Sequence, residues 1–136
     1  MKDGTPLQRL EYMGFRKVGA WSHNGEVFKC ALTDLGDSAN ILYAFVSNGS
    51  VLYIGKTVQP LKRRMYGYQN PALTQSTNIK ANKLIKEVLG ASATVEIYAL
   101  PDNGLLYYGG FHVNLAAGLE DNLIKALAPP WNRGGA

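Results

Sequence analysis

Two apolar stretches around an Asn-Gly pair, followed by a basic segment, constrain the fold more than any other part of the chain. Residues 41–47 and 51–55 have the composition of strands, and Asn48-Gly49 between them is typical of a β-hairpin turn. The segment after them carries Arg64 and Tyr68 at a spacing of four, which places both side chains on one side of a helix. We therefore expect a β-hairpin that leads directly into a short basic helix.

The apolar pattern also predicts the register of this hairpin. A two-residue turn would put the apolar face of the first strand on the side of Tyr53. A loop of odd length, such as 48–50 with a bulge, matches that face with Leu52 and Ile54 instead. We expect the odd loop, which places Tyr43 and Tyr53 on one face as diagonal neighbours, roughly 7–8 Å apart at the backbone.

The rest of the chain completes an α+β pattern. The further elements that we expect are a helix from Pro6, strands at 15–20 and 26–32, a helix from Ser76 or Thr77 to Gly90, a strand at 93–100 and a helix at 115–127. We expect a small central sheet of three strands, antiparallel or mixed, flanked by helices. Residues 39–136 would form this domain, and residues 1–38 would be a helix-and-hairpin extension packed on it.

Length, cysteine count and charge narrow the class of protein. A chain of 136 residues suggests one domain, and a single cysteine excludes an intrachain disulfide. With no signal peptide and no apolar run of membrane-spanning length, we expect a cytoplasmic protein without a membrane partner. All seven charged residues between positions 56 and 86 are basic, and they are Lys56, Lys62, Arg63, Arg64, Lys80, Lys83 and Lys86. Such a block is either a solvated face or a surface that neutralises nucleic-acid phosphates.

Each candidate site residue has a structural interpretation beside a catalytic one. Glu120 is either a surface glutamate or a carboxylate ligand for a hard divalent ion. Tyr43 and Tyr53 are either packing residues or catalytic groups, and catalysis would require a depressed phenol pKa. Arg64 is either solvated or neutralises charge on phosphate oxygens. Asn132 alone is a cap or turn residue.

Taken together, these positions resemble the GIY-YIG nuclease family. Ile41-Leu42-Tyr43 and Tyr53-Ile54-Gly55 resemble the two tripeptides that name the family, although Ile41 and Leu42 stand where the family has glycine and isoleucine. The other matches follow in the family's order, and they are Lys56, Arg64, Tyr68, Glu120 and Asn132. The resemblance covers about residues 40–133.

The resemblance implies hydrolysis of phosphodiester bonds in DNA, with one Mg²⁺ or Mn²⁺ ion on Glu120. It implies that Tyr43 is the general base, held by Tyr53 or Lys56. Arg64 would stabilise the transition-state phosphate.

The same resemblance implies that Tyr68 and Asn132 position water, phosphate or partner side chains. The expected substrate contacts are Lys56, Lys62, Arg63, Lys80 and Lys83. We expect DNA as the partner, no small-molecule cofactor, and a monomer or homodimer. Two alternatives stay open: a nucleic-acid-binding module without catalysis, and a structural domain whose tyrosines are only core.

Overall fold

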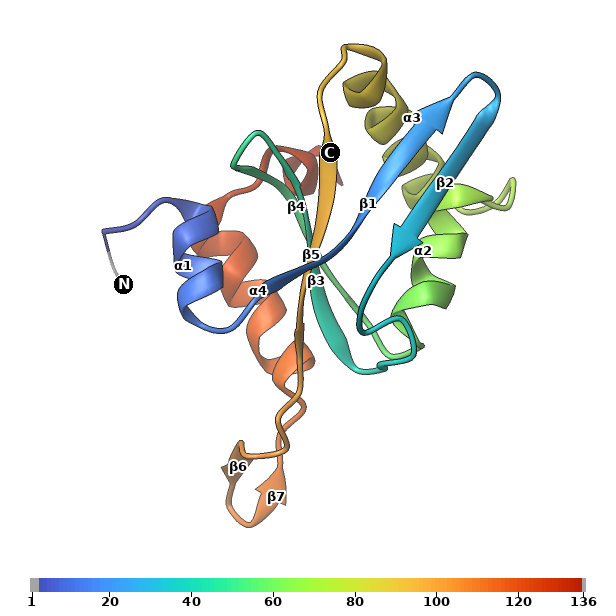
Figure 1. The fold of residues 1–136 in the computed structure, drawn as a ribbon. Coiled ribbons are helices and arrows are strands. Elements are labelled where there is room, and N and C mark those ends of the chain that lie inside the picture. Colours follow the sequence, from blue (N-terminus) through green and yellow to red (C-terminus); the bar gives the residue numbers. More distant parts are fainter. Residues whose placement is uncertain (1–2, 136) are drawn as a thin grey trace.

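The computed structural model describes residues 3–135, and its central element is a five-stranded antiparallel sheet (Figure 1). The strands lie in the order β2-β1-β5-β3-β4. Their bounds are β1 Arg16–Asn24, β2 Val27–Leu32, β3 Ile41–Ser47, β4 Ser50–Thr57 and β5 Val95–Pro101. The expectation of three strands is wrong because β5 pairs with β3 on one side and with β1 on the other, so the hairpin β1–β2 extends the same sheet.

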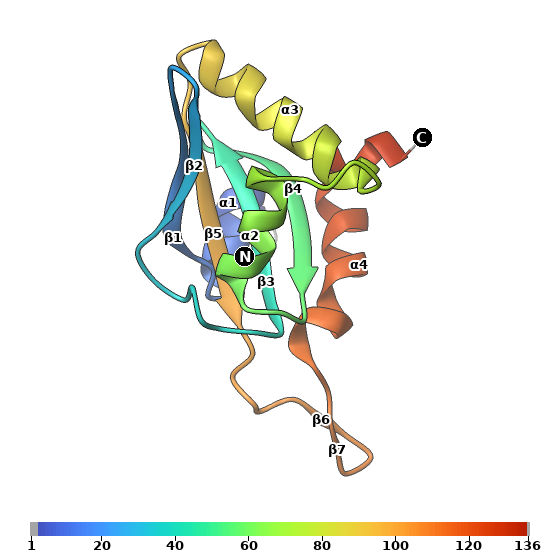
Figure 2. The same ribbon diagram turned by 90° about the vertical axis from the view of Figure 1, so that its right-hand side faces the viewer.

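Helices cover both faces of the sheet (Figure 2). Helices α1 (Pro6–Tyr12) and α4 (Leu115–Leu127) lie on one face, while α2 (Leu61–Gln69) and α3 (Ser76–Gly90) lie on the other. A short 3-10 helix, η1 (Pro130–Gly135), follows α4. Within residues 3–135, no helix combines the length and the apolarity needed to span a bilayer.

The side chains of strand β3 belong to two separate hydrophobic cores, because alternate side chains of a strand point to opposite sides. Tyr43 and Phe45 belong to the core under α2 and α3. Leu42 and Ala44 belong to the core that α1 and α4 cover. All seven residues of β3 are buried, so this strand forms the centre of the molecule.

The hairpin β3–β4 reaches the expected arrangement of faces by a different route. Asn48 and Gly49 have φ angles of 51° and 78° and form a two-residue turn, so the predicted odd loop is wrong. The register shifts farther along, where Leu52 is the extra residue of a β-bulge. The bulge supplies the odd residue that the apolar pattern requires. Tyr43 and Tyr53 therefore do share one face, with ring centroids 6.3 Å apart.

A second, two-stranded hairpin projects from the body between β5 and α4 (Figures 1 and 2). Its strands are β6 (Tyr107–Tyr108) and β7 (Phe111–His112), and they pair with each other in a sheet of their own. Sequence patterns predicted no secondary structure for this segment.

Candidate active site

A hydrogen-bonded chain of side chains connects β3 to α2. The hydroxyl oxygens of Tyr43 and Tyr68 are 2.6 Å apart, and either can donate. Arg64 Nη2 donates to the Tyr68 hydroxyl at 2.8 Å, and its guanidinium carbon lies 4.0 Å from the centre of the Tyr68 ring. The i, i+4 spacing on α2 thus brings Arg64 and Tyr68 together, and Tyr68 in turn contacts Tyr43.

Asn78 on α3 fixes the other end of the guanidinium. Arg64 Nη1 donates to Asn78 Oδ1 at 2.9 Å, and Asn78 Nδ2 donates to Gln75 Oε1 at 3.0 Å. Asn78 is buried, although hydrophobicity alone would favour its neighbour Ile79 for the core. Ile79 is exposed instead. The only sequence signal for Asn78 is its place one turn before Ala81 on the buried side of α3.

Gly55 makes room for the Tyr43 ring. The two residues are directly paired across β3 and β4. A Cβ atom on residue 55 would lie 2.6 Å from both Cζ and Oη of Tyr43, well inside the contact distance of about 3.5–4.0 Å. The glycine of the second tripeptide therefore has a local structural reason: it lets the tyrosine of the first tripeptide cross strand β4.

Burial dominates the titration of the two hydrogen-bonded tyrosines. Tyr43 and Tyr68 are 1% and 0% exposed. Burial raises the pKa of Tyr43 well above its ordinary value, while the nearby Arg64 charge acts in the opposite direction with a smaller effect. Burial likewise raises the pKa of Tyr68. The catalytic interpretation of Tyr43 calls for a depressed phenol pKa, and burial gives this side chain the opposite shift in this state.

Glu120 lies beside Lys56, on the other face of the sheet from Tyr43. Lys56 Nζ is 3.8 Å from Glu120 Oε1. Lys56 pairs with Leu42, whose side chain belongs to the core under α4, and α4 carries Glu120. The hydrogen-bonded side chains of Tyr43, Tyr68 and Arg64 thus approach strand β4 from one face, at Gly55. The Glu120–Lys56 pair lies on the opposite face, at the next residue.

Asn132 is bound to the open edge of β4. Its Oδ1 accepts from the main-chain N–H of Ile54 at 2.9 Å, and its Nδ2 donates to the Ile54 carbonyl oxygen at 2.9 Å. The amide therefore pairs with Ile54 as a neighbouring strand residue would. This contact holds η1 against the edge strand.

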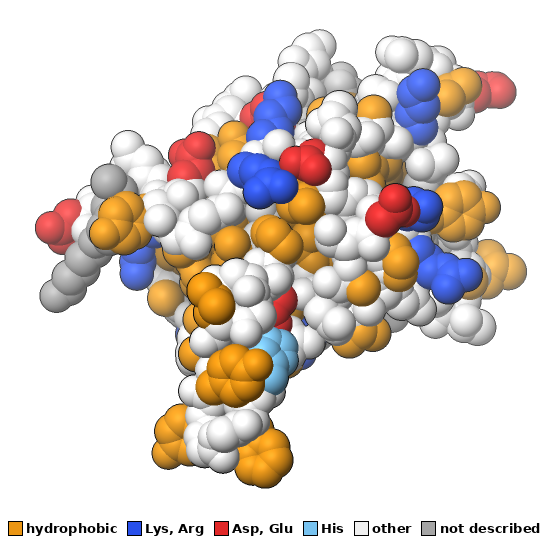
Figure 3. Space-filling model, turned by 60° about the horizontal axis from the view of Figure 1, so that its bottom comes forward, with side chains coloured by type: hydrophobic (Ala, Val, Ile, Leu, Met, Phe, Trp, Pro, Cys, Tyr) orange, Lys and Arg blue, Asp and Glu red, His pale blue; other side chains and the backbone are white. Residues whose placement is uncertain are grey.

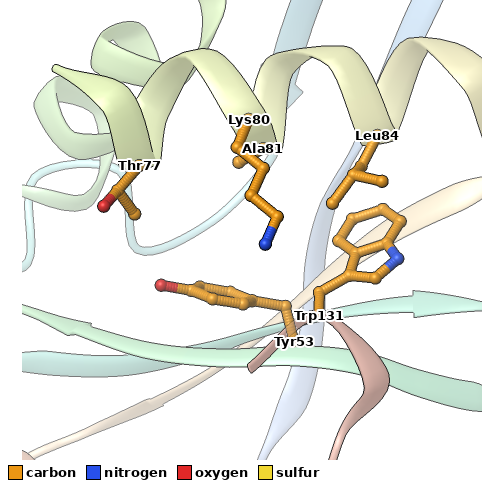
Figure 4. A pocket seen from close by; sticks show the side chains of 6 residues that line it. All are labelled: Tyr53, Thr77, Lys80, Ala81, Leu84 and Trp131. Carbon is orange, nitrogen blue, oxygen red and sulfur yellow. The ribbon is translucent and has the colours of Figure 1, made fainter. Parts of the chain in front are cut away.

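A small cleft separates η1 and β4 from α3 (Figure 4). It has a volume of about 270 Å³ including its open mouth, and it is lined by Tyr53, Thr77, Lys80, Ala81, Leu84 and Trp131. Figure 4 shows the Lys80 side chain extending from α3 toward the Tyr53 ring, with the Trp131 indole beside Leu84. Tyr53 is half-buried here, so it is the more accessible of the two hairpin tyrosines.

The comparisons with known proteins support the fold. No protein-family model and no curated protein matches the chain. A structure of a glutamate-to-alanine mutant of bacteriophage T4 EndoII matches 95% of this chain and 99% of that chain, with a TM-score of 0.73 and 22% identity. The restriction endonuclease HPY188I in complex with product DNA matches 99% of this chain and 84% of that chain, with a TM-score of 0.54 and 17% identity.

The fold of this chain is similar to the folds of T4 EndoII and HPY188I. The GIY-YIG assignment and the roles of individual residues stay predictions, because likenesses at this level of identity show the fold alone.

The basic residues predicted to bind substrate are spread over four settings. Lys62 is ion-paired with Asp37 at 2.6 Å, which offsets its charge. Arg63 and Lys83 are exposed on α2 and α3. Lys80 lines the cleft. Lys56, the last member of the set, lies beside Glu120.

Proposed function

We propose that this chain is a DNA endonuclease that hydrolyses phosphodiester bonds with the help of one divalent ion. The observation that carries the proposal is the convergence on β4 of a fixed arginine–tyrosine chain and of the carboxylate of Glu120. It is supported by the fold, which resembles that of two DNA endonucleases, one of which was solved with product DNA. An arginine and a carboxylate are the groups that phosphodiester hydrolysis needs for charge stabilisation and for metal binding.

Glu120 fits a metal site that the substrate completes. Among residues 3–135, no group of three or more His, Cys, Asp or Glu side chains could hold a metal ion. One partly exposed carboxylate suits Mg²⁺ or Mn²⁺, because Mg²⁺ often takes one or two carboxylates and leaves other positions to water and substrate phosphates. When bound, the ion would polarise a phosphoryl oxygen. We therefore expect weak metal binding without DNA.

Tyr43 is the proposed general base. Hydrolysis joins the water oxygen to phosphorus, passes one water proton to the base, and breaks the bond to the leaving oxygen, which takes up a proton. A phenolate on Tyr43 would accept a hydrogen bond from Tyr68, to which Arg64 donates. Hydrogen bonds to a charged form favour it, so this chain works against the burial that raises the pKa. Tyr53 is the alternative base.

The remaining residues have proposed roles around this centre. Arg64 stabilises charge on the phosphate oxygens, and Asn78 is a positioning residue because it holds the guanidinium. Asn132 is a positioning residue as well, since its amide secures Ile54 in strand β4. Arg63 and Lys83 are proposed to contact DNA phosphates.

A cleavage assay tests the proposal. Single-stranded, duplex and branched DNA would be incubated with the wild-type chain with and without Mg²⁺, and beside it with Glu120→Gln. The matched control is Asp121→Asn, because Asp121 is the next residue of α4 but is exposed and paired with Lys125. We expect Mg²⁺-dependent cleavage that falls by about 10²-fold or more in Glu120→Gln and is unchanged in the control. Equal cleavage by wild type and Glu120→Gln would refute the metal-site assignment.

The deep burial of Tyr43 and Tyr68 favours a second candidate, a DNA-binding module without catalysis. It predicts salt-sensitive binding of DNA and no product with any divalent ion. The same assay, with binding measured at several salt concentrations, distinguishes the two.

A further inference from the structure

The projecting hairpin between β5 and α4 exposes several large apolar side chains close together in the sequence. We call residues 105–112 the arm. Figure 3 shows hydrophobic side chains gathered on it. The exposed fractions of its large apolar side chains are Leu105 78%, Leu106 41%, Tyr107 60%, Tyr108 84% and Phe111 78%. A contiguous exposed patch of this kind marks an interaction site.

The arm has little support from its own chain. Its strands have two residues each and pair only with each other. At its base, the Val113 N–H donates to the Leu106 carbonyl oxygen at 2.7 Å, and His112 Nε2 lies 3.4 Å from Asp102 Oδ2. An isolated two-stranded hairpin is at best marginally stable in water. A partner that covers its aromatic side chains would therefore stabilise it.

The charge around the arm disfavours nucleic acid as that partner. Residues 101–124 contain no lysine and no arginine, and their charged residues are Asp102, Glu120 and Asp121. Phosphate contacts need positive charge, and the chain's basic block lies elsewhere, at positions 56–86. Exposed Tyr and Phe side chains with no lysine or arginine near them in the sequence are instead typical of the buried centre of a protein–protein interface.

We propose that the arm is a self-association surface, which packs against the arm of a second copy of this chain around a two-fold axis. The commonest soluble oligomers are dimers of this symmetry, in which each copy contributes the same patch. Three aromatic side chains per arm, at roughly 150–250 Å² each, would bury on the order of 1,000 Å² in the pair. That area is at the lower limit of specific interfaces, so the dimer is reversible and depends on concentration.

Sedimentation equilibrium without DNA or metal tests the inference. The arm variant is Tyr108→Ser with Phe111→Ser, which leaves the glycines of the turn in place. The control is Tyr12→Ser with Leu73→Ser, two side chains outside the arm that are 74% and 97% exposed. We expect the average mass of wild type and control to rise from one chain toward two between micromolar and near-millimolar concentration. The arm variant should stay at one chain, with its unfolding midpoint in urea unchanged.

Two results would overturn the inference. One is a wild-type chain that stays monomeric at every concentration. The other is an arm variant that dimerises as wild type does. A monomeric wild type whose DNA affinity falls in the arm variant would assign the arm to nucleic acid instead. Because the mass measurement uses no DNA, its result is independent of whether the chain proves to be a nuclease.

Discussion

Replacing Gly55 by alanine tests how the two strands of the hairpin fit together. The added Cβ would lie 2.6 Å from Cζ and Oη of Tyr43, about 1 Å inside normal contact. Tyr43 has little freedom to move away, because its ring contacts those of Phe45, Tyr53 and Tyr68 and its hydroxyl is bonded to Tyr68. The substitution therefore overpacks a buried site.

The expected loss of stability is about 3 kcal/mol. Overpacking a well-filled core costs about 1–3 kcal/mol. If the ring shifts enough to break the 2.6 Å bond to Tyr68, an unpaired buried hydroxyl costs about 1–3 kcal/mol more. Alanine recovers about 0.5–1 kcal/mol because glycine is unfavourable within a strand.

Urea unfolding of four chains measures this contact: wild type, Gly55→Ala, Tyr43→Leu and the double variant. Because Tyr43→Leu removes the ring that the new Cβ meets, the two changes should be coupled by at least about 1 kcal/mol. Gly90→Ala is the control, since a Cβ at the end of α3 would meet no atom within 4 Å; it should be neutral or slightly stabilising. A Gly55→Ala variant within about 0.5 kcal/mol of wild type, or strict additivity in the double variant, would refute the reasoning.

Three further predictions concern the same region. Asn132→Ala removes both hydrogen bonds to Ile54, so we expect a loss of about 2 kcal/mol in urea unfolding and faster hydrogen exchange at the Ile54 amide; unchanged exchange would contradict this. In Arg64→Lys, the new side chain cannot donate to Asn78 and Tyr68 at the same time as the two nitrogens of the guanidinium do. DNA cleavage should therefore fall by about 10²-fold, while the unfolding midpoint changes little. Above about pH 10 the unfolded chain loses phenolic protons that burial retains on Tyr43 and Tyr68 in the folded chain. Stability to urea should therefore fall by about 1.4 kcal/mol per pH unit for each of these tyrosines, and Tyr43→Phe should remove one such contribution.

Sequence patterns predicted correctly those features of helices and strands that residues close together in the chain determine. The helix at 115–127 has the expected bounds. The first helix begins at Pro6 as expected. Its start is fixed by a capping box, in which the side chains of Thr5 and Gln8 each accept a hydrogen bond from the other residue's main-chain N–H. The shared face of Tyr43 and Tyr53 also followed from alternation, although the turn did not: Asn48-Gly49 adopts the two-residue turn that this pair favours, and the parity is corrected at the bulge.

Non-local contacts account for what the sequence did not predict. The pairing of β1 with β5 joins residues about eighty positions apart, and no periodicity encodes it. Asn78 is buried because Arg64 from another helix binds its amide, whereas hydrophobicity alone favoured Ile79. The raised pKa of Tyr43 depends on its burial, which a pattern of neighbouring residues does not reveal, whereas the catalytic interpretation called for a depressed pKa.

The position of β4 explains how one site can draw on both faces of the sheet. A central strand has a neighbouring strand on both sides, so the sheet separates everything on one face from everything on the other. Strand β4 is an edge strand, and the two faces of the sheet meet around its open side. At Gly55 this strand lacks a side chain and the Tyr43 ring fills the gap, and at Lys56 the next side chain points to Glu120. Asn132 occupies the open edge at Ile54, one residue before Gly55. The groups proposed for catalysis therefore approach the end of this edge strand from both of its faces, and the proposal requires the phosphodiester to reach them around its open side.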